Sequence, residues 1–345
     1  MKNNILTRTA SSLYRFEVIR RYVKDSPEFW FIPKIFFNLF WRNSSFPRYI
    51  NFEITNICNF ACPMCPDSLI PKENRGSMSL DLFKKIMAEI DRYGSLNLHF
   101  VKMGEAFLHP EVSEFFRVIR RAKNRHRVMW VTNGSPLNPE NIQWLIDYEI
   151  DELNISIESL NPETFTRARG YDLKELLDKI SLLQKIKRTA RSRFPIISVN
   201  TVISKDNLAE LSAMRDYFKS RGIRQTTQKY NRTFTNADLG AENWTLDRTN
   251  ASSPHRYPCA HVFTNIAVNY DGTASLCCAD WNYAYIVGDL KRQTISEIWN
   301  SERYRDIRRA QLNGKYGDPP VCADCPNWQS HPDIFFRWQY KGYSR

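Results

Sequence analysis

Three cysteines stand close together near residue 60, at a spacing that suits an iron–sulfur cluster. Cys58, Cys62 and Cys65 follow the pattern C-x3-C-x2-C. Three thiolates can bind three irons of a four-iron cluster and leave the fourth iron open to a cofactor or substrate. A disulfide framework needs an even number of cysteines, and zinc sites usually show paired C-x2-C halves with a fourth ligand. The spacing therefore favours an open-cornered cluster, with zinc as the alternative.

The same run resembles the signature of the radical S-adenosylmethionine (radical SAM) superfamily, C-x3-C-x-Φ-C, in which Φ is usually aromatic or large and apolar. Met64 stands at the Φ position. The resemblance implies that SAM binds the open iron through its amino and carboxylate groups, and that reduction cleaves SAM to a 5′-deoxyadenosyl radical. It also implies a flavodoxin- or ferredoxin-type protein as the source of the electron.

A second set of cysteines lies in the last third of the chain. Cys259 and Cys277 flank the turn signal of residues 269–272, and Cys322 and Cys325 form a C-x2-C pair. A hairpin at the turn would bring the first two together, and four thiolates complete either an iron–sulfur or a zinc site. The pattern C-x12-G-x4-C followed by C-x2-C resembles the SPASM or twitch extension of radical SAM enzymes. That resemblance implies one auxiliary four-iron four-sulfur cluster with all four corners closed, and therefore two 4Fe-4S clusters in the chain.

Cys278 is left over from both sets. In some radical epimerases of this group a cysteine returns a hydrogen atom to the substrate, so the resemblance makes Cys278 a candidate catalytic hydrogen donor. Alternatively, Cys278 is a small buried apolar thiol beside a ligand, or it replaces Cys277 as the ligand.

Several polar residues follow the expected strands and resemble the SAM contacts of the family. Residues 102–110 resemble its GGEP motif, in which Glu105 would bind the α-ammonium group, although Met103 and Ala106 replace the usual Gly and Pro. The alternative for Glu105 is a helix N-terminal residue favoured by the helix dipole. Arg169 would pair with the SAM carboxylate through its planar fork of donors. The candidate cofactor-binding residues are Met64, Gly104, Glu105, Ser156, Arg169 and Asn200.

Short apolar runs alternate with amphipathic helical stretches between residues 49 and 230, which predicts a parallel sheet with helical crossovers. Six such units are too few for a closed eight-unit barrel. The resemblance implies an α/β fold, a partial (β/α)6 TIM-like barrel, with a C-terminal hairpin and helix domain for the auxiliary cluster. The expected strands are residues 49–55, 97–103, 128–132, 152–157, 196–203 and 224–228, followed by a hairpin of residues 262–268 and 273–276.

The domain boundaries follow from these patterns. Residues 1–48 are expected to form a helical, aromatic and basic extension, and residues 49–230 the radical SAM core. Residues 231–258 are polar without periodicity and are interpreted as a linker or substrate-covering loop. Residues 259–330 form the expected auxiliary-cluster domain, and residues 331–345 a tail.

Composition limits the class of protein. The 345 residues have 42% hydrophobic and 25% charged residues, which is typical of a globular protein. The N-terminus has no apolar signal region, so we expect a cytoplasmic protein with reduced cysteines. The first fifty residues hold nine Lys or Arg against three acidic residues, among many aromatic ones. This segment indicates either a helix packed on the barrel or a peripheral membrane contact.

The sequence therefore predicts a radical SAM oxidoreductase or isomerase-type enzyme. We expect dehydrogenation or epimerisation of a small molecule such as a sugar or an aminocyclitol. Peptide-modifying relatives often carry an N-terminal recognition domain of roughly eighty residues, and the forty-eight residues before the first strand are fewer. A ribosomal-peptide maturase, or an enzyme for a lipid-linked substrate, is the alternative. A zinc protein that binds nucleic acid would not explain six strand–helix units, and a pure electron carrier would not need an open cluster corner. We expect no nucleic-acid partner.

Overall fold

The computed structural model describes residues 45–229, 256, 258–317, 319–323 and 325. The chain divides into two compact units: residues 45–248 with 265–301, and residues 1–44 with 249–264 and 302–345. The expected extension up to residue 44, the linker apart from Arg256 and Pro258, and the expected tail lie outside the described residues. The expected domain boundaries remain a prediction.

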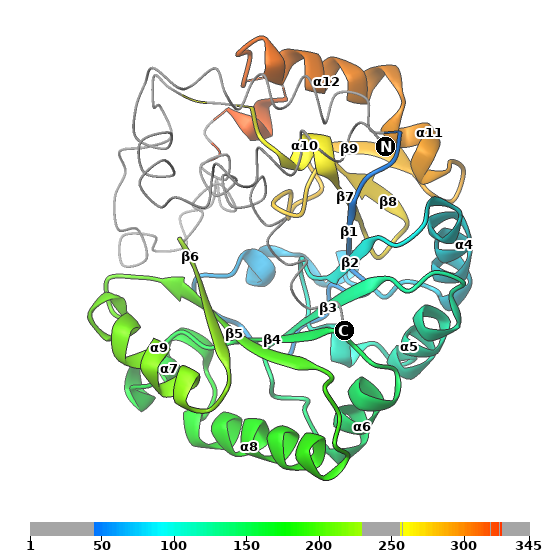
Figure 1. The fold of residues 1–345 in the computed structure, drawn as a ribbon. Coiled ribbons are helices and arrows are strands. Elements are labelled where there is room, and N and C mark those ends of the chain that lie inside the picture. Colours follow the sequence, from blue (N-terminus) through cyan, green and yellow to red (C-terminus); the bar gives the residue numbers. More distant parts are fainter. Residues whose placement is uncertain (1–44, 230–255, 257, 318, 324, 326–345) are drawn as a thin grey trace, which may run out of the picture. The chain divides into compact units, whose positions relative to one another are not determined.

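Nine strands within the described part of the chain form one sheet, in the order β6-β5-β4-β3-β2-β1-β7-β8-β9. Strands β1 to β6 run parallel and follow the chain in order, as the alternation of strands and helices predicted. The sheet curves without closing, which confirms the partial barrel (Figure 1). The parallel strands are β1 (Tyr49–Phe52), β2 (Asn97–Phe100), β3 (Arg127–Thr132), β4 (Glu152–Ser156), β5 (Ile196–Ile203) and β6 (Arg224–Lys229).

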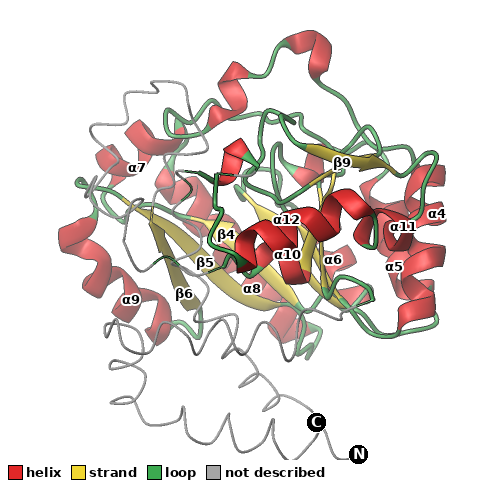
Figure 2. Ribbon diagram, turned by 90° about the horizontal axis from the view of Figure 1, so that it is seen from above, coloured by secondary structure: helices red, strands yellow, loops and turns green. Residues whose placement is uncertain are grey.

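Helices follow each of the first five strands and lie around the outer side of the sheet (Figure 2). Four of the six helix starts are encoded locally: the side chains of Ser79, Asn138, Asn161 and Asp172 each accept a hydrogen bond from a backbone N–H of the first turn. Ser79 in this way starts the first of these helices. The helices are α4 (Leu80–Ile90), α5 (Val112–Arg121), α6 (Pro139–Asp147), α7 (Pro162–Arg169), α8 (Leu173–Thr189) and α9 (Leu211–Ser220).

An aromatic cluster fills the space between the sheet and α4 and α5. Trp130 is fully buried and stacks on Phe100 at 4.4 Å between ring centroids, and Phe116 meets the same indole at 4.4 Å. Phe52 and Phe83 continue the cluster on β1 and α4. Each buried aromatic side chain adds roughly 2–3 kcal/mol of hydrophobic stabilisation. The cluster fixes β1, β2 and β3, and therefore the loops that follow them.

Strands β1 and β2 end earlier than the sequence predicted, at Phe52 and Phe100 rather than residues 55 and 103. For β2 the reason is backbone conformation, because Lys102 has φ 141° and does not continue an extended strand. The residues that were expected to end these strands instead form the loops at the carboxyl edge of the sheet.

The C-terminal strands extend the sheet beyond β1. Strand β7 (Asn265–Val268) pairs with β1 in parallel, and β8 (Thr273–Ser275) and β9 (Ile286–Asp289) follow in antiparallel order. The predicted turn is present, since Gly272 donates to the carbonyl of Asn269 with φ 87°. The prediction of one strand over residues 262–268 was wrong in its first half, where His261–Thr264 forms α10, because strand propensity depends strongly on context. In this helical turn the Thr264 hydroxyl donates to the Ala260 carbonyl at 2.8 Å.

Two further helices follow β9. A reciprocal capping box of Thr294 and Glu297 starts α11 (Ile295–Trp299). Helix α12 (Glu302–Leu312) follows it in the chain. Among the described helices, none is both long and apolar enough to cross a membrane.

Candidate cluster and cofactor site

The three clustered cysteines lie in the loop that follows β1, at the carboxyl edge of the parallel strands. Cys62 is buried, with 5% of its surface exposed, and Cys58 and Cys65 are partly buried. A turn holds two of them together, because the Cys65 N–H donates to the Cys62 carbonyl at 2.9 Å. In the described ranges, no three His, Cys, Asp or Glu side chains are arranged to hold a single metal ion. A cluster is different, because each of its irons takes its own thiolate and the sulfurs stand further apart.

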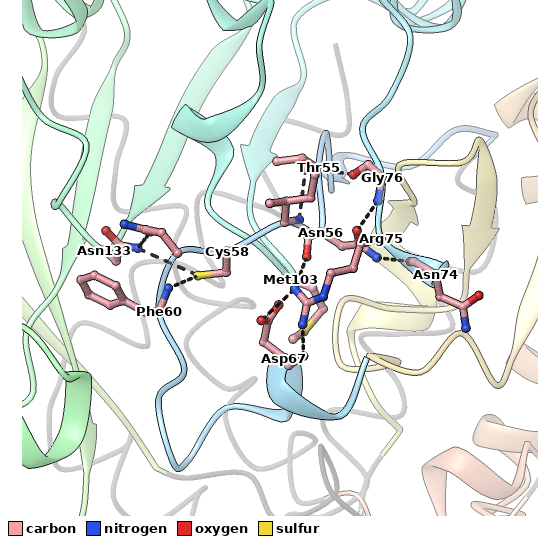
Figure 3. Close-up of polar contacts among 12 residues, drawn as sticks. Thr55, Asn56, Cys58, Phe60, Asp67, Asn74, Arg75, Gly76, Met103 and Asn133 are labelled. Carbon is pink, nitrogen blue, oxygen red and sulfur yellow. Dashed lines mark hydrogen bonds and ion pairs between the residues drawn. The ribbon is translucent and has the colours of Figure 1, made fainter. Parts of the chain in front are cut away.

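A network of polar side chains fixes both ends of the cysteine loop (Figure 3). Before the loop, the Asn56 amide donates to the Asn74 carbonyl at 2.8 Å and accepts from the Gly76 N–H at 2.8 Å. After the loop, the Arg75 guanidinium binds the Asp67 carboxylate at 3.0 Å and the Asp67 carbonyl at 2.6 Å. Arg75 also donates to the Asn56 carbonyl at 3.1 Å, so it joins the two ends.

Gly104 is the point where the loop after β2 meets the loop after β1. Its φ is 78°, in the left-handed region that favours glycine. A Cβ atom there would lie 2.3 Å from the Thr55 carbonyl oxygen and 2.8 Å from the Asn56 Cα. The resemblance placed Gly104 in the cofactor motif, and the structure shows that no larger residue fits without moving the backbone that leads to Cys58.

Glu105 binds the end of β3. Its carboxylate accepts hydrogen bonds from the Thr132 hydroxyl at 2.9 Å, the Asn133 N–H at 2.6 Å and the Phe107 N–H at 3.3 Å. Only 2% of the residue is exposed, and burial raises the pKa of the carboxyl to about 7. Three of the roughly four acceptor positions of a carboxylate are therefore used within the chain. The carboxylate has little capacity left for an ammonium group.

Arg169, at the end of α7, points to Cys62. Its Nη1 donates to the Cys62 Sγ at 3.6 Å, and its Nη2 and Nε donate to the two carboxylate oxygens of Glu158, at 2.6 Å for Nη2. The side chains are 14% and 1% exposed. Burial alone would lower the pKa of Arg169, but the Glu158 carboxylate and the Cys62 sulfur raise it above its ordinary value. The guanidinium is therefore charged and fixed next to a candidate ligand.

Donors also approach the first cysteine. The Phe60 N–H donates to the Cys58 Sγ at 3.5 Å, and the Asn133 amide lies 4.0 Å from the same sulfur while it donates to the Asn59 side chain at 2.9 Å (Figure 3). Burial raises the pKa of Cys58 to about 12 and that of Cys65 to about 11. The thiols therefore keep their protons until a metal displaces them. Three thiols with N–H donors and a guanidinium aimed at their sulfurs fit an anionic thiolate cluster.

The remaining candidate residues lie on the neighbouring strands and loop. Ser156 of β4 and Asn200 of β5 are register partners, so both half-buried side chains start from adjacent points at the carboxyl half of the sheet. Met64 is 7% exposed and packs with Cys62 and Ala168. The SAM contacts assigned to these residues remain predictions.

The second cysteine set is divided between the two compact units. In one unit Cys259 lies close to Cys322 and Cys325: burial raises the pKa of Cys259 well above its usual range, and the two other cysteines raise it further. In the same unit the Arg256 guanidinium donates to the carbonyls of Cys322 and Ala323, each at 2.6 Å.

Cys277 and Cys278 belong to the other unit, where both are half-buried just after β8. No disulfide joins any of the eight cysteines, all of which the structure describes. The structure thus gathers three of the four expected auxiliary ligands. Cys277 as the fourth ligand, and Cys278 as a hydrogen donor, remain predictions.

One polar group at the same edge was not found from the sequence. Glu53 follows β1, is 1% exposed and accepts from the Tyr283 hydroxyl at 3.0 Å. The Lys102 ammonium lies 4.2 Å from the centre of the Tyr283 ring and donates to Asn269 at 2.5 Å. Lys102 and Tyr283 both have positive φ. A charged residue directly after an apolar strand was the available signal for Glu53, whereas nothing local in the sequence marks Tyr283.

Two family models match the chain. The model of the radical SAM superfamily matches residues 52–217, which contain the three clustered cysteines and the four strands β2 to β5. The model of an iron–sulfur cluster-binding domain, SPASM, matches residues 259–326, which contain the second cysteine set.

Relatives and solved structures agree with these matches. A tungsten-containing aldehyde ferredoxin oxidoreductase cofactor-modifying protein of Pyrococcus furiosus is 24% identical over 81% of this chain and 87% of its own. Further curated relatives match about half of this chain and about half of their own length. The structure of BtrN with AdoMet and 2-DOIA has a TM-score of 0.56 at 18% identity, over 81% of this chain and 93% of BtrN. The structure of Streptococcus suis SuiB with its precursor peptide SuiA has a TM-score of 0.64 at 12% identity, over 83% of this chain and 71% of SuiB.

Proposed function

Because the chain belongs to the radical SAM superfamily and carries a C-terminal SPASM domain, we propose that it removes a hydrogen atom from an unreactive carbon of a small molecule, leading to dehydrogenation or epimerisation. When bound, the cluster and SAM supply the 5′-deoxyadenosyl radical for this step. The proposed domains are a core of residues 49–230 and an auxiliary-cluster domain of residues 259–330.

The observation that carries the proposal is the loop of Cys58, Cys62 and Cys65 at the carboxyl edge of the sheet. The loop provides three thiols, and Arg169, Asn133 and the Phe60 N–H present donors to two of the sulfurs. Donors directed at sulfur stabilise the anionic form that a ligand must have. Active groups of such folds gather at this edge, because the loops after parallel strands converge there.

The other residues of the site position these ligands. Glu105 fastens the loop after β2 to the end of β3, and Gly104 permits the close approach of that loop to Thr55. In the proposed complex, backbone groups around Gly104 and the side chains of Ser156 and Asn200 contact SAM. Both side chains lie on strands whose carboxyl ends face the same edge as the cysteine loop.

Two solved structures similar to this chain contain substrates of different kinds. The similarity to BtrN, whose structure contains AdoMet and 2-DOIA, supports a small molecule such as an aminocyclitol. The similarity to SuiB, whose structure contains the precursor peptide SuiA, supports a peptide as the second candidate.

Deuterium transfer distinguishes these candidates. Reconstituted protein would be incubated with SAM, dithionite and deuterated aminocyclitols or sugars, and 5′-deoxyadenosine would be analysed by mass spectrometry. We expect at least one deuterated aminocyclitol or sugar to transfer deuterium to 5′-deoxyadenosine. The Cys62→Ala variant should show no such transfer. Deuterium transfer from labelled peptides alone would overturn the small-molecule proposal and leave radical initiation intact.

A further inference from the structure

A buried ion pair contacts the sulfur of the most buried cysteine in the candidate cluster loop. The Arg169 guanidinium uses two nitrogens to bind both oxygens of Glu158, and its remaining nitrogen, Nη1, lies 3.6 Å from the Cys62 Sγ. Both side chains are largely shielded from solvent, at 14% and 1% exposure. Water and salt therefore screen these charges much less than they screen surface charges.

The backbone holds this arrangement from both sides. Glu158 follows β4 by two residues, and the Asn207 amide donates to its carbonyl at 2.8 Å. Arg169 is the last residue of α7, which ends at Gly170 in the left-handed conformation with a hydrogen bond to the Thr166 carbonyl. A cation at a helix C-terminus is favoured by the helix dipole. The guanidinium is therefore positioned before any ligand binds.

We propose that the Arg169–Glu158 pair sets the reduction potential of the cluster bound by Cys58, Cys62 and Cys65, with Arg169 raising that potential and Glu158 opposing it. This inference rests on the proposed function, because it requires a cluster at these cysteines. One electron from dithionite or a flavodoxin-type protein adds one negative charge to the cluster and its thiolates, and no proton is transferred. A fixed cation and a hydrogen bond to a ligand sulfur both favour the more negative, reduced state.

The geometry separates this role from the pairing with the SAM carboxylate that the sequence suggested for Arg169. A carboxylate is best bound by two parallel N–H groups of the guanidinium fork. In this structure Glu158 already binds Nε and Nη2, and Nη1 faces sulfur. Arg169 acts here as a positioning and charge-setting residue, and Glu158 holds its fork in place.

Opposite charge changes provide the test. Full-length protein would be reconstituted anaerobically and titrated with dithionite, and the SAM-responsive cluster signal would be followed by electron paramagnetic resonance. We expect Arg169→Gln to shift the midpoint potential negative and Glu158→Gln to shift it positive, each by at least tenfold in the reduction equilibrium, or about 59 mV for one electron. Arg167→Gln is the matched control, because Arg167 lies on the same helix, is 60% exposed and binds Asp206; its potential should equal that of the wild type.

A structural disturbance of the cysteine loop would give a different result from a change of charge. If the two substitutions only loosened the loop and admitted water, both would shift the midpoint potential in the same direction. That result would overturn the inference, and so would the absence of a shift in both variants. Arg169→Lys keeps the positive charge, and it provides a second test if Arg169→Gln does not bind iron. The reduction equilibrium of Arg169→Lys should stay within threefold of that of the wild type. A midpoint potential as negative as that of Arg169→Gln would refute the role of the charge. Absence of iron at Cys58, Cys62 and Cys65 in the wild type would instead overturn the proposed function itself.

Discussion

Replacement of Gly104 by alanine tests the packing between the cofactor motif and the cysteine loop. The new methyl group would lie 2.3 Å from the Thr55 carbonyl oxygen and 2.8 Å from the Asn56 Cα, and both of these atoms belong to the backbone. No side-chain rotation can relieve the overlap. A left-handed conformation costs a non-glycine residue about 1–2 kcal/mol, and overpacking costs a further 1–3 kcal/mol. We therefore expect Gly104→Ala to lower the free energy of unfolding by roughly 2–5 kcal/mol.

Gly222→Ala is the matched control for this substitution. Gly222 has φ 68°, and a Cβ atom there meets nothing within 4 Å, so only the backbone cost of about 1–2 kcal/mol applies. Urea denaturation of the metal-free, reduced protein measures both variants, and iron analysis after reconstitution measures the consequence for the cysteine loop. Equal loss of stability in the two variants, with full iron in Gly104→Ala, would refute the packing argument.

Three further predictions concern the pH dependence of stability, the aromatic core and the cluster ligands. Burial raises the pKa of Glu105 from 4.5 to about 7, so between these pH values the folded chain keeps a proton that the unfolded chain loses. The stabilisation due to this proton should be complete below pH 4.5 and should be lost as the pH rises to 7. Urea denaturation at several pH values should show this decrease in the wild type and not in Glu105→Gln. Trp130→Ala should lower the free energy of unfolding by about 3–5 kcal/mol. Leu208→Ala, at a position that is 52% exposed, should lower it by less than about 1 kcal/mol. Similar losses in the two variants would contradict the placement of Trp130 in the core. Cys62→Ala should lose about four of eight irons on reconstitution, whereas Cys278→Ala should keep them all, and a matching loss in Cys278→Ala would make Cys278 the ligand in place of Cys277.

The repeating fold could be predicted from the sequence because its signals are local. The six parallel strands follow from apolar runs, and the cap at Ser79 follows from a serine before an amphipathic stretch. The cysteine spacing is likewise local, and the family matches confirm the radical SAM superfamily and the SPASM-type domain that it indicated. The error at His261–Thr264 arose because apolar β-prone residues can also form a helical turn when the surrounding chain favours it.

The partners of the site residues could not be predicted, since they depend on contacts distant in sequence. The sequence marked Arg169 and Glu105 as charged groups near a cofactor, but did not reveal that Arg169 binds Glu158 and Cys62, or that Glu105 binds the end of β3. Tyr283 is 230 residues from the carboxylate that it contacts, Glu53. Only the fold determines which of the many polar residues are brought to the same edge of the sheet.

The central claim is that Cys58, Cys62 and Cys65 hold a cluster that initiates radical chemistry. The most direct measurement is anaerobic iron and sulfide analysis of the reconstituted protein, followed by incubation with SAM and dithionite. We expect about eight irons per chain and formation of 5′-deoxyadenosine, with that product lost in Cys62→Ala. Zinc in place of iron, or 5′-deoxyadenosine formation that persists in Cys62→Ala, would contradict it.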